Sequence, residues 1–276
     1  MKDKLLEFFR IFPWADDPES EEGKKYYNFT IKNMDKLLKH PWFEDILKKK
    51  EIKILEICGG AGFGSIALSK LLLEKDLEID LIITDLRKEV LKRAKKFGEK
   101  ALKRDIMAKV MDAKEVHKLR KKFDIALMYG LSTPHFSPWD IIKVFSSVNR
   151  ILEDDGIFII DEVDRRYKTF LMSGYKWVLG EGKGDKFVIS FHTGYDILKG
   201  TFKRTFFNPT LSKKPLTIEF YFWGLSEMGA LIFLFFKDVD FLHINNTRYF
   251  ILGYKPRRIL KPEEFKEPFL FRKNIL

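Results

Sequence analysis

Short apolar runs alternate with longer amphipathic segments across residues 53–160. The short runs predict buried strands, and apolar residues that recur every three or four positions predict helices. The expected strands are Lys53–Ile57, Leu77–Thr84, Lys109–Met111, Asp124–Tyr129 and Gly156–Ile160, and the expected helices are Ser65–Leu73, Arg87–Phe97, Lys114–Lys121 and Trp139–Leu152. This alternation is typical of a parallel sheet that helices cover on both faces.

The flanking segments follow other patterns. Helical periodicity predicts N-terminal helices at Lys2–Phe12, which Pro13 ends, at Lys24–Leu38 and at Trp42–Lys48. About sixty residues from Asp161 to Trp223 separate the fifth strand from the next helix, and a stretch of that length needs structure of its own. Antiparallel strands are expected there at Phe187–Thr193, Thr201–Phe207 and Leu216–Trp223, followed by a helix Leu225–Lys237 and a hairpin of Val239–Ile244 and Arg248–Tyr254 around Asn245-Asn246.

The composition indicates a folded protein with a basic surface. The 276 residues carry a formal charge of +11, and 45% of them are hydrophobic. The basic residues are spread along the chain among acids, which favours a solvated surface, although an acidic partner such as RNA stays open. Many Lys and Glu with no Gln are typical of a thermophilic source.

The single cysteine and the lengths of the apolar runs indicate where in the cell the protein is expected. Cys58 excludes an intramolecular disulfide, as expected in a reducing cytoplasm. Residues 1–5 lack a signal-peptide layout, and the run Met228–Phe236 is too short to span a bilayer. We therefore expect a cytoplasmic protein that does not insert into membranes.

A glycine-rich turn follows the first expected strand. Glu56 ends the strand, a helix begins at Ser65, and between them stand Gly59, Gly60, Gly62 and Gly64. Glycine lets a ligand approach the backbone closely, and the start of the helix presents unpaired N–H groups. The turn therefore predicts a nucleotide-type ligand at the carboxyl end of the strand.

The turn resembles motif I of the class I, Rossmann-like S-adenosylmethionine-dependent methyltransferases, an acid followed by glycines at every second position. Glu56, Gly60, Gly62 and Gly64 match, and Cys58 stands where the first glycine of the motif usually lies. A nicotinamide dinucleotide site fits less well, because Ser65 takes the place of its third glycine. The resemblance covers residues 54–160 and the closing helix and hairpin, and it implies that S-adenosylmethionine is the cofactor.

Two further acids are expected beside this turn. Asp85, followed by Leu86, closes the second strand, where a carboxylate can bind both ribose hydroxyls. The resemblance implies that an acid after the third strand faces the adenine amino group, and Asp112, followed by Ala113, has that position. Each acid has an alternative role as a helix N-cap.

The residues after the fourth and fifth strands are candidates for chemistry. Tyr129 and Gly130 are expected beside the methionyl part of the cofactor, and His135 is either a general base or a loop histidine that caps a helix or faces water. No metal is expected. The catechol-type, metal-dependent methyltransferases of this family have an acid at the end of the fourth strand, where this chain has Tyr129. The acids of residues 161–164 either bind an amine, a metal or a proton, or form a solvated loop.

The resemblance implies an α/β, three-layer Rossmann-like fold with a mostly parallel sheet, a C-terminal antiparallel hairpin, N-terminal helices and an antiparallel β insert. We expect residues 1–50 to form a helical cap, 51–160 the cofactor-binding core, 161–223 a β-rich substrate cover, and 224–276 the C-terminal part of the core. The expected activity is methyl transfer to a small molecule by in-line displacement. An RNA or protein methyltransferase and a non-catalytic module that binds the cofactor are the alternatives, and the oligomeric state stays open.

Overall fold

The protein is described by a computed structural model that covers residues 2–12, 16–182, 187–210 and 214–272. Pro13, where the first helix was expected to end, lies outside these residues. The central sheet has seven strands in the order β10-β11-β5-β4-β1-β2-β3. Their bounds are β1 Glu51–Glu56, β2 Glu78–Asp85, β3 Met107–Val110, β4 Phe123–Met128, β5 Leu152–Val163, β10 Phe236–Asn245 and β11 Arg248–Pro256.

The sheet is mostly parallel, which confirms the expected fold class. β1 pairs in parallel with β2 and β4, β2 with β3, and β4 with β5. The closing hairpin is antiparallel, and β11 lies beside β5 through pairs such as Ile251 with Ile160. The carboxyl ends of β1, β2 and β4 therefore meet at one edge of the sheet, where the glycine-rich turn begins.

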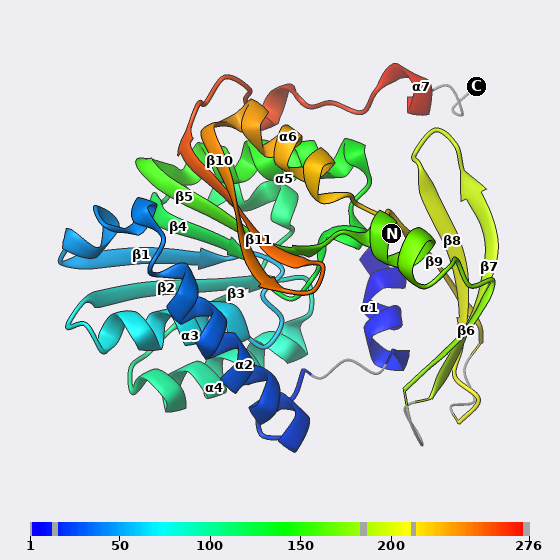
Figure 1. Cartoon of the computed structure of the whole chain (residues 1–276), viewed down its shortest axis with the longest axis horizontal. Coiled ribbons are helices and arrows are strands. Elements are labelled where there is room, and N and C mark those ends of the chain that lie inside the picture. The colour runs from blue at the N-terminus through cyan, green and yellow to red at the C-terminus, as the bar shows by residue number, and fades with distance from the viewer. Residues whose placement is uncertain (1, 13–15, 183–186, 211–213, 273–276) are drawn as a thin grey trace.

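Helices cover both faces of the sheet (Figure 1). α2, α3 and α4 bury residues such as Met34, Ile66 and Ala94 against one face, and α5 and α6 bury Phe145 and Met228 against the other. Their bounds are α2 Glu21–Leu37, α3 Phe63–Leu73, α4 Lys88–Leu102, α5 Pro138–Ile151 and α6 Leu225–Phe235, with a short α7 at Phe269–Arg272. Among the described residues, no helix combines the length and the apolar character needed to cross a bilayer.

A second, antiparallel sheet stands beside the central one. Its order is β6-β7-β8-β9, with bounds Val178–Glu181, Val188–Asp196, Thr201–Phe207 and Leu216–Phe220. Helix α1, Lys2–Ile11, lies between the two sheets (Figure 1). Phe8 and Ile11 are buried against Phe206 and Ile218 of the small sheet. The N-terminal helix thus closes the space between core and insert.

Some local expectations were wrong. Trp42–Lys48 forms two separate 3₁₀ turns rather than one helix, because Pro41 starts the first turn and the side chain of His40 caps it. The segment expected as a helix at Lys114–Lys121 is a 3₁₀ helix, Ala113–Leu119. The insert contains β6 and a π-helical turn, Tyr167–Met172, that no pattern predicted, and the hairpin turn falls at residues 246–247, because β10 continues to Asn245.

Candidate active site

The glycine-rich turn connects β1 to α3 at the carboxyl edge of the sheet. Gly60 has a φ of 54°, in the left-handed region that glycine adopts without strain. A Cβ on Gly64 would lie 2.6 Å from Glu56 Oε1 and 2.6 Å from Cβ of Tyr129, so no other residue fits there without movement. The turn is therefore shaped by glycine at the places where backbone and neighbouring side chains come closest.

Cys58 occupies a position that favours glycine. Its φ is 53°, which explains why the motif that this turn resembles usually has glycine at this position. Burial raises the pKa of its thiol above the usual range, so the thiol stays protonated and is a poor nucleophile.

The variant Cys58→Gly is expected to keep the turn and to remove this left-handed strain. A non-glycine residue in this region costs roughly 1–2 kcal/mol, partly offset by the greater freedom of glycine in the unfolded chain. We therefore expect the free energy of unfolding to change by less than about 1 kcal/mol in urea titrations. A loss of several kcal/mol would show that the thiol packs in a way that the backbone geometry does not reveal.

Glu56 is completely buried at the base of the turn. Its Oε2 accepts hydrogen bonds from the backbone N–H of Ser65 at 3.1 Å and from the Ser65 hydroxyl. Its Oε1 has no hydrogen-bond partner among the described residues. Burial raises the pKa of the carboxyl to about 8. Glu56 thus holds the start of α3 and keeps one oxygen for a further donor.

Asp85 clamps the turn from β2. Its Oδ2 accepts from Gly60 N at 2.9 Å, and its Oδ1 accepts from Arg87 N and Nε at 2.9 and 3.0 Å. Arg87 also approaches Asp16 at 3.7 Å and lies 4.1 Å from the centre of the Phe9 ring. The Arg87 guanidinium therefore stands between Asp85 and the adjoining cavity, so a sugar could reach this carboxylate only if the guanidinium shifts.

The third expected acid has a different role in this structure. Asp112 Oδ1 accepts from Lys114 N at 2.9 Å and caps the 3₁₀ helix that begins at Ala113. Asp112, Ala113 and Leu86 all lie outside the lining of the cavity that adjoins the glycine-rich turn. The N-cap is thus observed, and the contact of Asp112 with adenine stays a prediction.

Gly130 follows β4 and is held by a buried ion pair. Its φ is 101°, and its N–H donates to Asp161 Oδ2 at 3.1 Å. Arg248 Nε donates to Asp161 Oδ1 at 2.6 Å, and Arg248 Nη2 reaches the Tyr26 hydroxyl at 3.3 Å. Tyr129 is anchored in turn to the hydroxyl of Thr30 at 3.0 Å. Residues from β5, β11 and α2 therefore fix the loop after β4.

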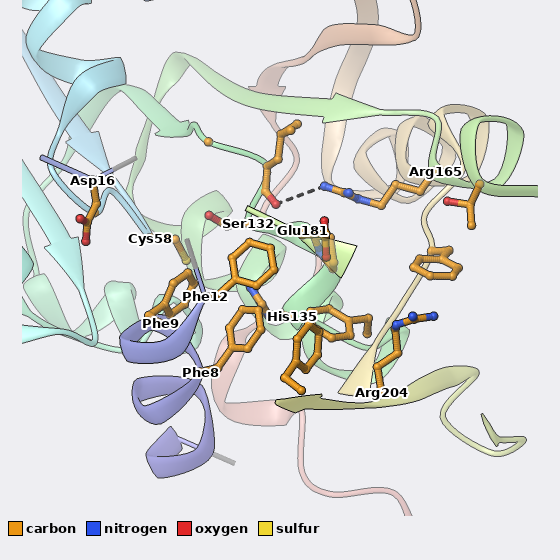
Figure 2. Close-up of a pocket in the computed structure, with 18 of the residues that line it drawn as sticks. Phe8, Phe9, Phe12, Asp16, Cys58, Ser132, His135, Arg165, Glu181 and Arg204 are labelled. Carbon is orange, nitrogen blue, oxygen red and sulfur yellow. Dashed lines mark hydrogen bonds between the residues drawn. The ribbon is translucent and has the colours of Figure 1, made fainter. Parts of the chain in front are cut away.

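A cavity of about 470 Å³ runs from the glycine-rich turn to the insert. Among the expected site residues, it is lined by Glu56, Cys58, Gly59, Gly60, Tyr129, Gly130 and His135, whereas Gly62, Gly64, Asp85, Leu86, Asp112 and Ala113 lie outside its lining. Figure 2 shows Phe8 and Phe9 of α1 and the adjoining Phe12 on one side, Arg204 of β8 on the other, and His135 beside the phenylalanine rings. The structure thus brings together about half of the expected residues.

His135 ends a short 3₁₀ helix, Thr133–His135, and is enclosed by aromatic rings. Its ring lies 5.4 Å from that of Phe9 and 5.5 Å from that of Phe220. Burial lowers the pKa of the imidazole to about 3, and Nδ1 has no hydrogen-bond partner among the described residues. A neutral ring whose buried Nδ1 has no partner among the described residues therefore lies among the aromatic rings that line the cavity.

The acids of residues 161–164, at the end of β5 and just beyond it, are used in structural contacts. Glu162 is buried, pairs with Arg165 Nε at 3.2 Å and accepts from the Thr133 hydroxyl. Asp164 accepts from Leu225 N at 3.2 Å at the start of α6. With Asp161 paired to Arg248, these acids form neither an open cation site nor a solvated loop. The described residues bring no group of three His, Cys, Asp or Glu side chains into a metal-binding arrangement.

Several lining residues escaped the sequence reasoning. Arg87, Arg165, Lys168 and Arg204 all line the cavity, together with the rings of α1. One signal was present at Arg204, which stands between Phe202 and Phe206 on the same face of a strand. A charged residue in an otherwise apolar alternation often marks a site, but the pattern does not say which site.

The cavity fits an adenosyl cofactor at its glycine-rich end. The turn offers closely approachable backbone at Gly59 and Gly60, and Gly130 leaves open space where a Cβ would stand. The partnerless, buried Oε1 of Glu56 lies at the same end and can accept a hydrogen bond from a donor such as an ammonium group.

Comparisons with known proteins agree with this geometry. Residues 54–156 match the family model of a methyltransferase domain. No curated protein matches the sequence significantly. Solved structures share the fold over most of the chain.

The PH0226 protein of Pyrococcus horikoshii is 22% identical, with a TM-score of 0.63, over 91% of this chain and 99% of the other. An S-adenosylmethionine-dependent methyltransferase of Clostridium acetobutylicum is 15% identical, with a TM-score of 0.59, over 91% and 98%. An amino pentose methyltransferase of Micromonospora echinaspora, solved with S-adenosylmethionine bound, is 10% identical, with a TM-score of 0.55, over 85% and 93%. Residues 54–156 thus match a methyltransferase domain, and the chain has the Rossmann-like fold of solved S-adenosylmethionine-dependent methyltransferases.

Proposed function

We propose that this protein is a methyltransferase that uses S-adenosylmethionine and acts on a small molecule that binds in the cavity between the core and the insert. The observation that carries this proposal is the aromatic lining of the cavity, in which the rings of α1 and of the small sheet adjoin the glycine-rich turn. Its volume of about 470 Å³ lies in the range of small-molecule pockets. The resemblance to an amino pentose methyltransferase supports the same class of acceptor.

Different residues of the cavity bind the cofactor and exclude water from the reacting atoms. When bound, S-adenosylmethionine supplies a methyl group that its sulfonium already activates. Glu56, the backbone at Gly60 and Gly130, and Asp85 hold the cofactor at the turn. The rings of Phe8 and Phe220 exclude water around the reacting atoms. Positioning thus supplies most of the rate, as expected for an in-line displacement.

His135 orients the acceptor in this proposal. An imidazole with a pKa of about 3 is neutral at pH 7 and holds a proton poorly, so it is a weak general base. Its free Nδ1 can still accept a hydrogen bond from an O–H or N–H of the acceptor and point the lone pair of that group at the methyl group.

The variant His135→Phe is expected to keep the packing of the ring and to lose this hydrogen bond. The turnover number should fall about tenfold, the scale of one hydrogen bond of about 1.4 kcal/mol. Calorimetry should find the affinity for S-adenosylhomocysteine unchanged. A turnover number equal to that of the wild type would remove His135 from the mechanism.

A basic groove of the described surface lies away from the cavity, which favours a small-molecule acceptor over RNA. A groove lined by Lys118, Arg120, Lys121, Lys122 and Arg150 lies at the amino end of β4, whereas Gly130 follows the carboxyl end. The six residues of β4 separate these ends by roughly 20 Å. This basic groove therefore does not adjoin the cavity.

A labelling experiment tests the proposal. Protein is incubated with methyl-labelled S-adenosylmethionine and, in parallel, with the low-molecular-mass fraction of a cell extract, with total RNA and with total protein. We expect label in the small-molecule arm alone. Label in RNA or protein, lost on nuclease or protease treatment, would contradict the proposed acceptor class while leaving the cofactor assignment intact.

A further inference from the structure

The insert side of the cavity carries a buried cation without a carboxylate partner. The side chain of Arg204 lines the cavity, and the residue is only 7% exposed. Its donors reach neutral groups: Ser190 Oγ at 3.1 Å, the Lys176 carbonyl at 2.8 Å and the Tyr175 hydroxyl at 3.3 Å. Among the described residues, no Asp or Glu oxygen lies within 4 Å of this guanidinium. A buried charge that is hydrogen-bonded but not neutralised favours an incoming anion.

Two lysines add to this positive end. Lys168, in the π-helical turn, and Lys176, before β6, line the same cavity, and neither forms an ion pair with any described residue. Glu181 of β6 is the acid that lines this end, and burial raises its pKa. Three cations therefore face a single carboxyl at this end, so positive charge is in excess here.

The other cavity cations are already neutralised. Arg87 pairs with Asp85 and approaches Asp16, and Arg165 pairs with Glu162. The excess positive charge is therefore local to the insert end, away from the glycine-rich turn. Between this end and His135 the wall consists of the rings of Phe206, Phe220 and Phe222.

We infer that the methyl acceptor carries an oxyanion, a carboxylate or a phosphate, that binds between Lys168, Lys176 and Arg204. This inference rests on the proposed function and names its substrate class. The donors of Arg204 are engaged, so Arg204 contributes charge, and the two ammonium groups contribute the direct hydrogen bonds. The apolar body of the acceptor then lies on the phenylalanine rings, with its reacting atom beside His135.

A binding experiment with simple probes tests the inference. Protein saturated with S-adenosylhomocysteine is titrated by calorimetry with phenyl phosphate, benzoate and benzyl alcohol. At least one of the two anions is expected to bind about tenfold more tightly than the alcohol, the scale of a hydrogen bond to a charged group, and the tighter anion distinguishes phosphate from carboxylate. Equal binding of all three probes, or no binding of any, would overturn the inference.

Two sets of variants test which residues cause the preference for an anionic probe. Replacing both exposed lysines, Lys168→Met with Lys176→Met, should abolish the preference for the anion without unfolding the protein. Lys203→Met is the matched control, because Lys203 neighbours Arg204 on β8, points to the opposite face and does not line the cavity. An anion preference that survives the double replacement would contradict the inference. Failure of S-adenosylhomocysteine to bind in the first step would instead contradict the cofactor site of the proposed function.

Discussion

Replacing Arg248 by methionine is expected to lower the free energy of unfolding by about 3–5 kcal/mol, the usual cost of removing one partner of a buried ion pair. The Asp161 side chain is completely buried, and Arg248 donates to both of its oxygens. Without Arg248 the carboxylate would stay buried, with the backbone N–H of Gly130 as the one remaining hydrogen-bond donor to this side chain among the described residues. Urea titration followed by circular dichroism measures the change.

Two further variants separate this effect from a general loss of charge. Arg93→Met removes a surface pair with Asp16 and should cost less than about 1 kcal/mol. The double variant Arg248→Met with Asp161→Leu removes both charges and should be more stable than Arg248→Met alone. If Arg248→Met lowers the free energy of unfolding no more than Arg93→Met does, the Asp161–Arg248 pair does not fix the loop after β4.

Asp85→Ala is expected to weaken the binding of S-adenosylhomocysteine by roughly 1–3 kcal/mol, about 5- to 150-fold in the dissociation constant. The physical reason is twofold. The variant loses the carboxylate that is expected to accept from the ribose hydroxyls, and it also loses the bond from Gly60 N that holds the turn. Isothermal titration calorimetry measures the change directly.

Controls for this variant come from the same strand and from its ion-pair partner. Asp80→Ala, also on β2 but paired with Lys121 away from the turn, should leave the affinity unchanged. Arg87→Met should not weaken binding, because it frees the carboxylate oxygens that the guanidinium occupies. An affinity of Asp85→Ala equal to that of the wild type would refute the ribose assignment.

The parts of the site that are local in sequence could be predicted from it. Glu56 and the glycines lie within nine residues, and both the strand before them and the helix after them follow from periodicity. The positive φ of Cys58 gives a physical reason for the glycine that the motif usually has at this position. The alternation of strands and helices likewise sufficed for the order of layers in the core.

The parts that depend on tertiary contacts could not be predicted. Asp161 and Arg248 are 87 positions apart, and only the antiparallel pairing of β5 with β11 brings them together. Nothing in the sequence near Asp85 indicates that Arg87 would turn back onto it beneath Phe9 of α1. The 3₁₀ helix at Ala113–Leu119 shows the same limit, because α and 3₁₀ helices differ by one hydrogen-bond step and share similar residue preferences.

The most direct test is a crystal structure of the protein with S-adenosylhomocysteine. We expect the nucleoside to lie against residues 58–60, with its ribose on the carboxylate of Asp85 and its sulfur directed toward Gly130 and His135. The Arg87 guanidinium is then displaced from Asp85. Density for the nucleoside elsewhere, or an Arg87 that still covers Asp85 while the ligand is bound, would contradict this expectation.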